Sequence, residues 1–247
     1  MGLALVAVTV SEAFIFAGLP EWALWGHFVT LVACSLAPLR FEGDATVFRA
    51  LALVPLFRLV NLGMPVFAEP TIYWFPLVYG ALIPGMFLLS RTHDIDIRYG
   101  WRVALLALPL AIPLSALLAS LEHSLITPEA LVSAATPDQL LLIGVVMVCF
   151  VGFVEEFLFR GILQDVLERR YGRMAGLLLT SALFGLLHAG YGLQHEILFA
   201  GVIGLLFGVV YDWTDSLVLV TLLHGLLNVF LFAIIPIYGS VLGPFGL

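Results

Sequence analysis

The sequence predicts an all-α protein, a polytopic transmembrane helix bundle with about eight to nine spans. Three observations lead to this fold class: the composition, the number of long apolar runs, and the distribution of the arginines. Of the 247 residues, 62% are hydrophobic and only 11% are charged, whereas a soluble globular domain carries about 25% charged residues. Water therefore cannot be the main solvent around this chain, and we expect an integral membrane protein.

Apolar runs that can cross a bilayer recur along the whole chain. A transmembrane helix needs about 20 mostly apolar residues, with a range of roughly 17–25. Nine runs of about this length are present, at about 2–19, 22–38, 46–66, 72–90, 101–121, 138–166, 173–190, 194–212 and 216–236. The first two runs can also form one re-entrant hairpin. No internal repeat of the kind found in many transporters is visible, and we expect a single membrane domain.

The arginines indicate the orientation. The chain has ten basic residues, all arginine, and eight of them lie in every second connection between the runs. These are Arg40 and Arg49 in the second connection, Arg91, Arg98 and Arg102 in the fourth, and Arg169, Arg170 and Arg173 in the sixth. The positive-inside rule makes this face cytoplasmic, which predicts a cytoplasmic N-terminus. The lack of lysine favours a prokaryotic source, and we therefore expect the protein in a prokaryotic cytoplasmic membrane. With a net charge of −7, the chain offers no basic surface for nucleic acid.

The sixth run contains three charged residues within six positions: Glu155, Glu156 and Arg160. Each charged residue inside a bilayer costs at least about 2.5–3.5 kcal/mol and needs a reason. Glu156 and Arg160 are four residues apart on one helical face and can pair. Glu155 points away from this face, so its carboxylate is less well neutralised, which suits a general base. A purely structural Glu–Arg clamp between helices is the alternative.

Two later runs carry further polar groups. His188 lies at the end of the seventh run, and His224 and Asn228 lie one turn apart in the ninth. Each of these alone can be a packed or interhelical polar residue. With a rise of about 1.5 Å per residue, however, Glu155 lies about 16 Å from the cytoplasmic end of its run, His188 about 22 Å, His224 about 12 Å and Asn228 about 18 Å. The sequence therefore predicts that they converge in one cavity.

These residues form three ordered motifs on three separate runs. The motifs are Glu-Glu-x-x-x-Arg (Glu155, Glu156, Arg160), Phe-x-x-x-His (Phe184, His188) and His-x-x-x-Asn (His224, Asn228). Together they resemble the CAAX-protease and bacteriocin-processing (CPBP or Abi) family of intramembrane proteases, whose eukaryotic branch includes the type II CAAX prenyl endopeptidase. The resemblance covers about residues 145–232. It divides the chain into N-terminal transmembrane helices without a recognised motif, 1–125, and a catalytic core, 137–236.

The resemblance implies a role for each motif residue. It implies that Glu155 activates a water molecule with help from His188, and that His224 and Asn228 donate to the oxyanion. Glu156 and Arg160 would shape the site, with Phe184 in support. The implied activity is hydrolysis of a peptide bond in a membrane-bound or lipidated polypeptide. A prenylated substrate is carried over from the eukaryotic branch, and no residue of this chain demands it.

Other readings stay open. Glu155, His188 and His224 are a possible zinc ligand set, but the sequence His195-Glu196 is not followed by the second histidine of a His-Glu-x-x-His motif. We therefore favour a metal-free glutamate mechanism without a cofactor. A proton-coupled transporter that uses the intramembrane glutamates, or a catalytically silent immunity or binding protein, is the alternative function.

A second pair of charges lies far from these motifs. Glu12 falls in the first run and Arg58 in the third. Opposite charges buried in different spans can neutralise each other, and we interpret this pair as structural.

Overall fold

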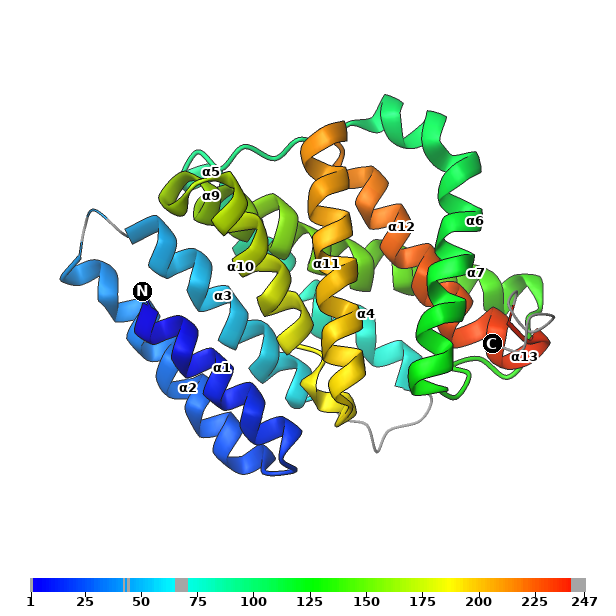
Figure 1. Cartoon of the computed structure of the whole chain (residues 1–247), viewed down its shortest axis with the longest axis horizontal. Helices are drawn as coiled ribbons and strands as arrows, with labels where there is room; N and C mark the ends of the chain where they lie inside the picture. The colour runs from blue at the N-terminus through cyan, green and yellow to red at the C-terminus, as the bar shows by residue number, and fades with distance from the viewer. Residues whose placement is uncertain (1, 42, 44, 65–70, 241–247) are drawn as a thin grey trace. The chain divides into compact units, whose positions relative to one another are not determined.

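The computed structural model describes the chain except for residues 1, 42, 44, 65–70 and 241–247. Throughout this described part the regular elements are helices (Figure 1). Eight of its helical segments are long and apolar enough to cross a membrane: Pro20–Leu39, Ala45–Leu62, Thr71–Thr92, Trp101–Ile126, Pro137–Tyr171, Arg173–Tyr191, Gln194–Thr214 and Leu217–Tyr238. The predicted all-α transmembrane fold is confirmed.

The first predicted span is shorter than expected. Helix α1 (Gly2–Phe16) is apolar but has 15 residues, which is below the roughly 17 that a span requires. Gly18 adopts a left-handed backbone with φ of 73°, a conformation that commonly ends helices. Pro20 then stands at the first position of α2 (Pro20–Leu36), where a proline suits the start of a helix. The predicted end of the third span at residue 66 lies outside the described residues.

The helices fall into two compact units that alternate along the chain. Unit 1 consists of the described parts of 1–64, 82–97 and 158–209, and unit 2 of the described parts of 65–81, 98–157 and 210–247. Each unit thus takes residues from both predicted sequence segments, 1–125 and 137–236. The expectation of a single membrane domain stays a prediction.

In unit 1 the N-terminal helices lie side by side. Helix α2 packs against α1 and against α3 (Ala45–Leu62) (Figure 1). The predicted partners Glu12 and Arg58 form a buried two-bond ion pair between α1 and α3, with both N···O distances at 2.7 Å. The predicted pairing is confirmed. Unit 1 also contains η1 (Ala37–Leu39), α5 (Ile83–Thr92), most of η5 (Phe157–Gln164), α9 (Asp165–Tyr171), α10 (Arg173–Leu186), η6 (Ala189–Tyr191) and most of α11 (Gln194–Thr214).

In unit 2 the central contact is between α6 (Trp101–Ile126) and α12 (Leu217–Val229), and α12 also packs on the π-helical segment η4 (Val146–Gly152) (Figure 1). Two glycines make this second contact close. A Cβ on Gly225 would lie 2.6 Å from the Cα of Val148, and one on Gly152 would lie 3.0 Å from the backbone nitrogen of Gly225. The backbones of α12 and η4 are therefore in contact at Gly225, directly after His224 in the sequence. Unit 2 also contains η3 (Thr71–Tyr73), α4 (Trp74–Gly80), α7 (Pro137–Val145), α8 (Phe153–Glu156), η7 (Phe230–Ile234) and α13 (Ile235–Tyr238).

The start of α12 is fixed by the loop that precedes α6. Arg98 binds Asp215 through its guanidinium, and its Cζ lies 4.5 Å from the centre of the Tyr211 ring. Burial lowers the pKa of Arg98, but the phenol of Tyr211 and the carboxylate of Asp215 outweigh burial, and the pKa rises above its ordinary value. Ser216, the N-cap of α12, donates to the carbonyl of Gly100 at 2.9 Å. Unit 2 thus holds the first turn of α12 by side-chain contacts to residues 98–100.

The segment Pro137–Tyr171 is helical over 35 residues, longer than the predicted run of 138–166. It is not a uniform α-helix. The π-helical segments η4 and η5 (Phe157–Gln164) flank α8, which holds Glu155 and Glu156. π-Helical turns are rare and occur frequently at functional sites, so the helix geometry itself marks the Glu-Glu pair.

Candidate active site

The two glutamates and His224 form one buried cluster in unit 2. The Nδ1 atom of His224 lies 2.7 Å from Oε1 of Glu156, and its Nε2 atom lies 3.8 Å from Oε2 of Glu155. The three side chains are at most 8% exposed. Because an ionised carboxylate only accepts hydrogen bonds, the short contact requires the proton of the imidazole on Nδ1. The imidazole therefore bridges two carboxylates that stand next to each other in the sequence.

A residue that the sequence analysis missed completes this cluster. The hydroxyl of Tyr79, in α4, donates to Oε1 of Glu155 at 3.1 Å. Tyr79 was not among the site residues predicted from the sequence. A buried tyrosine needs a partner for its hydroxyl, so a tyrosine within an apolar run was the available signal. Tyr79 stabilises the carboxylate of Glu155 and fixes its orientation.

Helix α12 presents its predicted polar residues on one face. Asn228 follows His224 by one turn and is also buried. Ser115, in α6, donates to the carbonyl of Leu223 at 2.9 Å. That carbonyl belongs to the residue before His224, so the backbone on which His224 stands is tied to α6 as well as to η4.

The remaining motif residues belong to unit 1, where Arg160 lies in an aromatic environment. Its Cζ is 4.5 Å from the centre of the Phe184 ring, and the rings of Phe207 and Phe159 follow at 5.8 and 5.9 Å. Its Nη2 atom donates to the carbonyl of Gly204 at 3.0 Å. A planar guanidinium suits such stacking with an in-plane hydrogen bond. Arg160 thus joins η5 (Phe157–Gln164) to α10 and α11 within unit 1.

His188 follows the C-terminal turn of α10. Its Nδ1 atom lies 2.9 Å from the carbonyl oxygen of Phe184. A carbonyl can only accept, so Nδ1 carries the proton and Nε2 is the basic atom of the neutral ring. The ring centres of His188 and Phe184 are 5.0 Å apart, and the ring of Tyr191 stacks on that of His188 at 6.3 Å with an interplanar angle of 12°. These contacts within unit 1 define the tautomer of His188 and orient its ring.

Each unit brings together part of the predicted site. Unit 2 holds Glu155, Glu156, His224 and Asn228, and unit 1 holds Arg160, Phe184 and His188. The pairing of Glu156 with Arg160 and the cooperation of Glu155 with His188 join residues of different units and stay predictions. In the described part of the chain, no three His, Cys, Asp or Glu side chains are grouped so that they could hold a metal ion.

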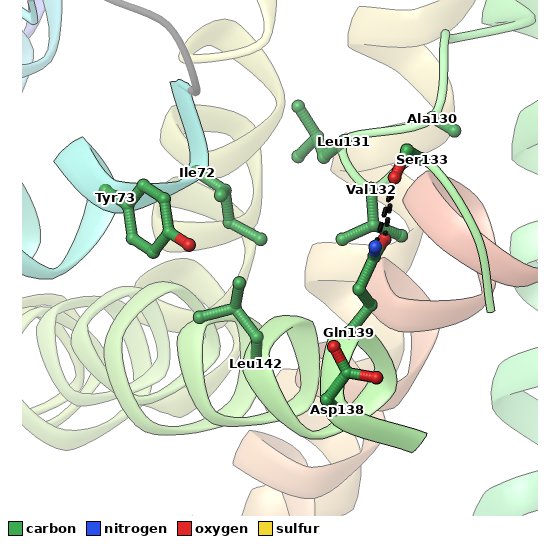
Figure 2. A pocket seen from close by; sticks show the side chains of 9 residues that line it. All are labelled: Ile72, Tyr73, Ala130, Leu131, Val132, Ser133, Asp138, Gln139 and Leu142. Atoms are coloured by element: carbon green, nitrogen blue, oxygen red, sulfur yellow. Dashed lines mark hydrogen bonds between the residues drawn. The ribbon is translucent and has the colours of Figure 1, made fainter. Parts of the chain in front are cut away.

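Unit 2 contains a separate pocket of about 470 Å³ (Figure 2). It lies between η3, the loop after α6 and the start of α7, and Gln139 in its wall donates to the hydroxyl of Ser133 at 3.0 Å. Leu142 in its wall precedes Glu155 by 13 residues, which corresponds to about 20 Å along a helix. Its polar wall residues are Tyr73, Ser133, Asp138 and Gln139, which include one carboxylate and no imidazole. We do not assign it to the candidate site.

The fold and the buried groups define a class: a polytopic helical membrane protein that keeps carboxylates and imidazoles inside its helices. Within this class, residues 137–230 match the model of a known family, described as type II CAAX prenyl endopeptidase Rce1-like. This match confirms the resemblance to CAAX proteases found in the three motifs. The family points to a hydrolase, a membrane-bound protease. No curated protein and no solved structure matches the chain.

Proposed function

We propose that this chain is an intramembrane endopeptidase that hydrolyses a peptide bond of a membrane-associated, prenylated or otherwise lipidated polypeptide. The observation that carries the proposal is the buried Glu155–His224–Glu156 cluster. It lies within the segment that matches an endopeptidase family. Charged groups are costly inside a bilayer, and three of them in one cluster favour chemistry over simple packing.

In the proposed mechanism Glu155 is the general base. Its carboxylate takes a proton from a water molecule while the water oxygen bonds to the carbonyl carbon of the substrate, which leaves an oxyanion. The tetrahedral intermediate then collapses, the C–N bond breaks, and Glu155 returns the proton to the leaving amine. The hydrogen bond from Tyr79 holds one oxygen of this carboxylate. The other oxygen, Oε2, is the one nearer to His224.

The oxyanion requires donors that are in place before the reaction. Nδ1 of His224 donates to Glu156, so donation to an oxyanion would come from Nε2, on the Glu155 side of the ring. Both ring nitrogens then carry a proton, and the imidazole is positively charged. Glu156 then acts by fixing the ring and stabilising its positive charge. Asn228, one turn further on the same face, supplies a second donor from its amide group.

His188 is the second candidate base. Its Nδ1–H bond to the carbonyl of Phe184 leaves Nε2 to accept a proton from the water. Arg160 and Phe184 support the turn that carries it. A bound zinc ion held by Glu155, His188 and His224 would instead lower the pKa of the water directly. We propose the metal-free version.

The test combines a peptidase assay with metal removal. The purified protein in lipid nanodiscs is offered a farnesylated CAAX peptide, and Glu155→Gln and His188→Gln are compared with wild type, with folding checked by thermal unfolding. We expect both variants to lose at least about 100-fold in kcat, the loss typical of removing a general base. Membrane proteomics of the host with the same variants tests substrates other than the farnesylated peptide. Unchanged cleavage and unchanged membrane peptides in both folded variants would refute the proposal.

The metal-free version has its own control. After treatment with a strong chelator, elemental analysis confirms that the protein contains no metal, and we expect turnover to persist. Loss of activity on chelation, with recovery on adding one equivalent of zinc, would replace the metal-free version by the zinc mechanism and leave the peptidase assignment intact.

A further inference from the structure

A second buried charged cluster lies in unit 1, outside the segment that matches the endopeptidase family. It consists of Glu12 in α1, His27 in α2 and Arg58 in α3, each at most 5% exposed. The family match begins at residue 137, and the proposed mechanism uses none of these side chains. Three ionisable groups inside one helix bundle need a reason.

The geometry of the cluster holds the guanidinium of Arg58 firmly. Its Nε and Nη2 atoms donate to the two carboxylate oxygens of Glu12, both at 2.7 Å. Such paired charge-assisted bonds fix the plane of the guanidinium as well as its position. Nε2 of His27 lies 3.1 Å from the same carboxylate, although it is not aligned for a hydrogen bond. Glu12 therefore acts as an anchor that orients Arg58.

Arg58 has a third partner, and it lies at the C-terminal end of α10. Its Nη2 atom also donates to the carbonyl of Leu187, the C-cap of that helix. The last carbonyls of a helix have no partner within the helix, and a cation at this end is also favoured by the helix dipole. Arg58 therefore caps α10 from a helix that lies more than 120 residues earlier in the chain.

The residue that follows this capped carbonyl is His188. Its ring is bonded through Nδ1 to the carbonyl of Phe184, in the last turn of the same helix. Two hydrogen bonds thus fix the turn that carries His188. The histidine ring binds the carbonyl of Phe184, and Arg58 binds the carbonyl of Leu187. A shift of Leu187 changes the direction in which the peptide enters His188, and the ring moves with it.

We propose that Arg58, oriented by Glu12, is a positioning residue for His188. The effect on turnover rests on the proposed endopeptidase function, whereas the effect on the histidine ring does not. This assigns to the N-terminal helices, for which the sequence offers no motif, the task of fixing one of the two imidazoles of the site. Unit 2 uses a comparable contact at the other imidazole, where Ser115 donates to the carbonyl before His224.

Replacing both charges distinguishes a positioning role of Arg58 from a purely structural ion pair. A buried ion pair can often be exchanged for apolar residues of similar size without loss of stability, whereas removing one partner leaves a buried unpaired charge. The double variant Glu12→Met/Arg58→Met thus preserves the packing of the three helices but removes the donor to Leu187. If the pair is structural only, this variant behaves as wild type. If Arg58 positions His188, the variant is stable but impaired.

The first experiment compares thermal unfolding and cleavage of the farnesylated CAAX peptide in nanodiscs. We expect Glu12→Met/Arg58→Met to unfold within about 4 °C of wild type, a small change on the usual scale of stability effects. We expect its kcat to fall about 10- to 100-fold, since misplacement of a catalytic group by about 1 Å has effects of this size. We expect KM to change less than about twofold, because substrate binding does not depend on the position of His188. Arg58→Lys keeps one donor and should recover part of kcat. Ser11→Ala is the matched control, because Ser11 is the buried neighbour of Glu12 and its hydroxyl donates to the carbonyl of Ala7 within α1.

The second experiment does not depend on activity. ¹⁵N-histidine labelling resolves the ring nitrogens of the six histidines, and the His188→Gln variant assigns the signals of His188. In wild type we expect the Nδ1–H tautomer, and in Glu12→Met/Arg58→Met a shifted or averaged pair of signals. Wild-type signals and wild-type kcat in that stable variant would overturn the proposal. If wild type cleaves no peptide, the proposed function fails, and the histidine signals still decide whether Arg58 positions His188.

Discussion

The close contact between α12 and η4 predicts that Gly225→Ala disrupts the site through the backbone. The new Cβ would lie 2.6 Å from the Cα of Val148, and an ordinary contact begins at 3.4 Å. The two helices must therefore separate by about 0.8 Å at this point. If His224 moves by the same amount, its contact with Glu156 lengthens from 2.7 Å to about 3.5 Å, where a hydrogen bond is essentially lost.

The expected magnitude follows from that bond. A hydrogen bond to a charged group contributes about 1.5–3 kcal/mol, which corresponds to a factor of about 10 to 100 in rate when the bond orients a reacting group. Overpacking adds a stability loss of about 1–3 kcal/mol. We therefore expect Gly225→Ala to remain folded with a lowered melting temperature and to cleave the farnesylated CAAX peptide about 10- to 100-fold more slowly.

The control is Gly144→Ala, in α7 of the same unit. A Cβ on Gly144 has nothing within 4 Å, and alanine is better than glycine inside a helix by about 0.5–1 kcal/mol. This variant should be as active as wild type and no less stable. A folded Gly225→Ala protein with the turnover of Gly144→Ala would show that the distance between α12 and η4 does not control the site.

Three further variants test other contacts with the same peptide assay and thermal unfolding. Tyr79→Phe removes the donor to Glu155 and should lower kcat about tenfold at nearly constant stability, since that bond is charge-assisted; equal kcat would show that the phenol is not needed. Arg160→Lys loses the planar stacking on three aromatic rings and should destabilise the protein by about 2 kcal/mol, and an unchanged melting temperature would contradict this. Ser115→Ala removes the bond to the carbonyl before His224 and should cost about 1 kcal/mol with a few-fold loss of kcat, whereas a gain in stability would argue against that contact.

The helices could be predicted from the sequence because membrane spans are local features. Length and apolarity located all eight long segments within a few residues, whereas α1 is shorter than a span requires, because Gly18 and Pro20 end it early. The buried Glu12–Arg58 pair was also predictable, since two opposite charges in apolar spans have few other ways to be neutralised.

The partner of Glu156 was not predictable from spacing. The spacing of four residues predicted Arg160 as the partner, on the same face of a regular α-helix. The structure adds His224 as a partner, 68 residues away, and the intervening segment begins a π-helix at Phe157, in which the α-helical rule for facing side chains does not hold. Tyr79 lies 76 residues from Glu155. Contacts over such separations depend on tertiary packing, and nothing in local periodicity encodes them.

The alternation of the two units along the chain has a consequence for how the protein is made. Residues up to 64 belong to unit 1, yet its last part ends at residue 209. At a synthesis rate of about 5–20 residues per second, the first helices exist for roughly 7–30 s before their last neighbours emerge from the ribosome. During this interval Arg58 has Glu12 but not yet Leu187. The ion pair between Glu12 and Arg58 lowers the cost of keeping the first three helices in lipid until the rest of the chain is synthesised.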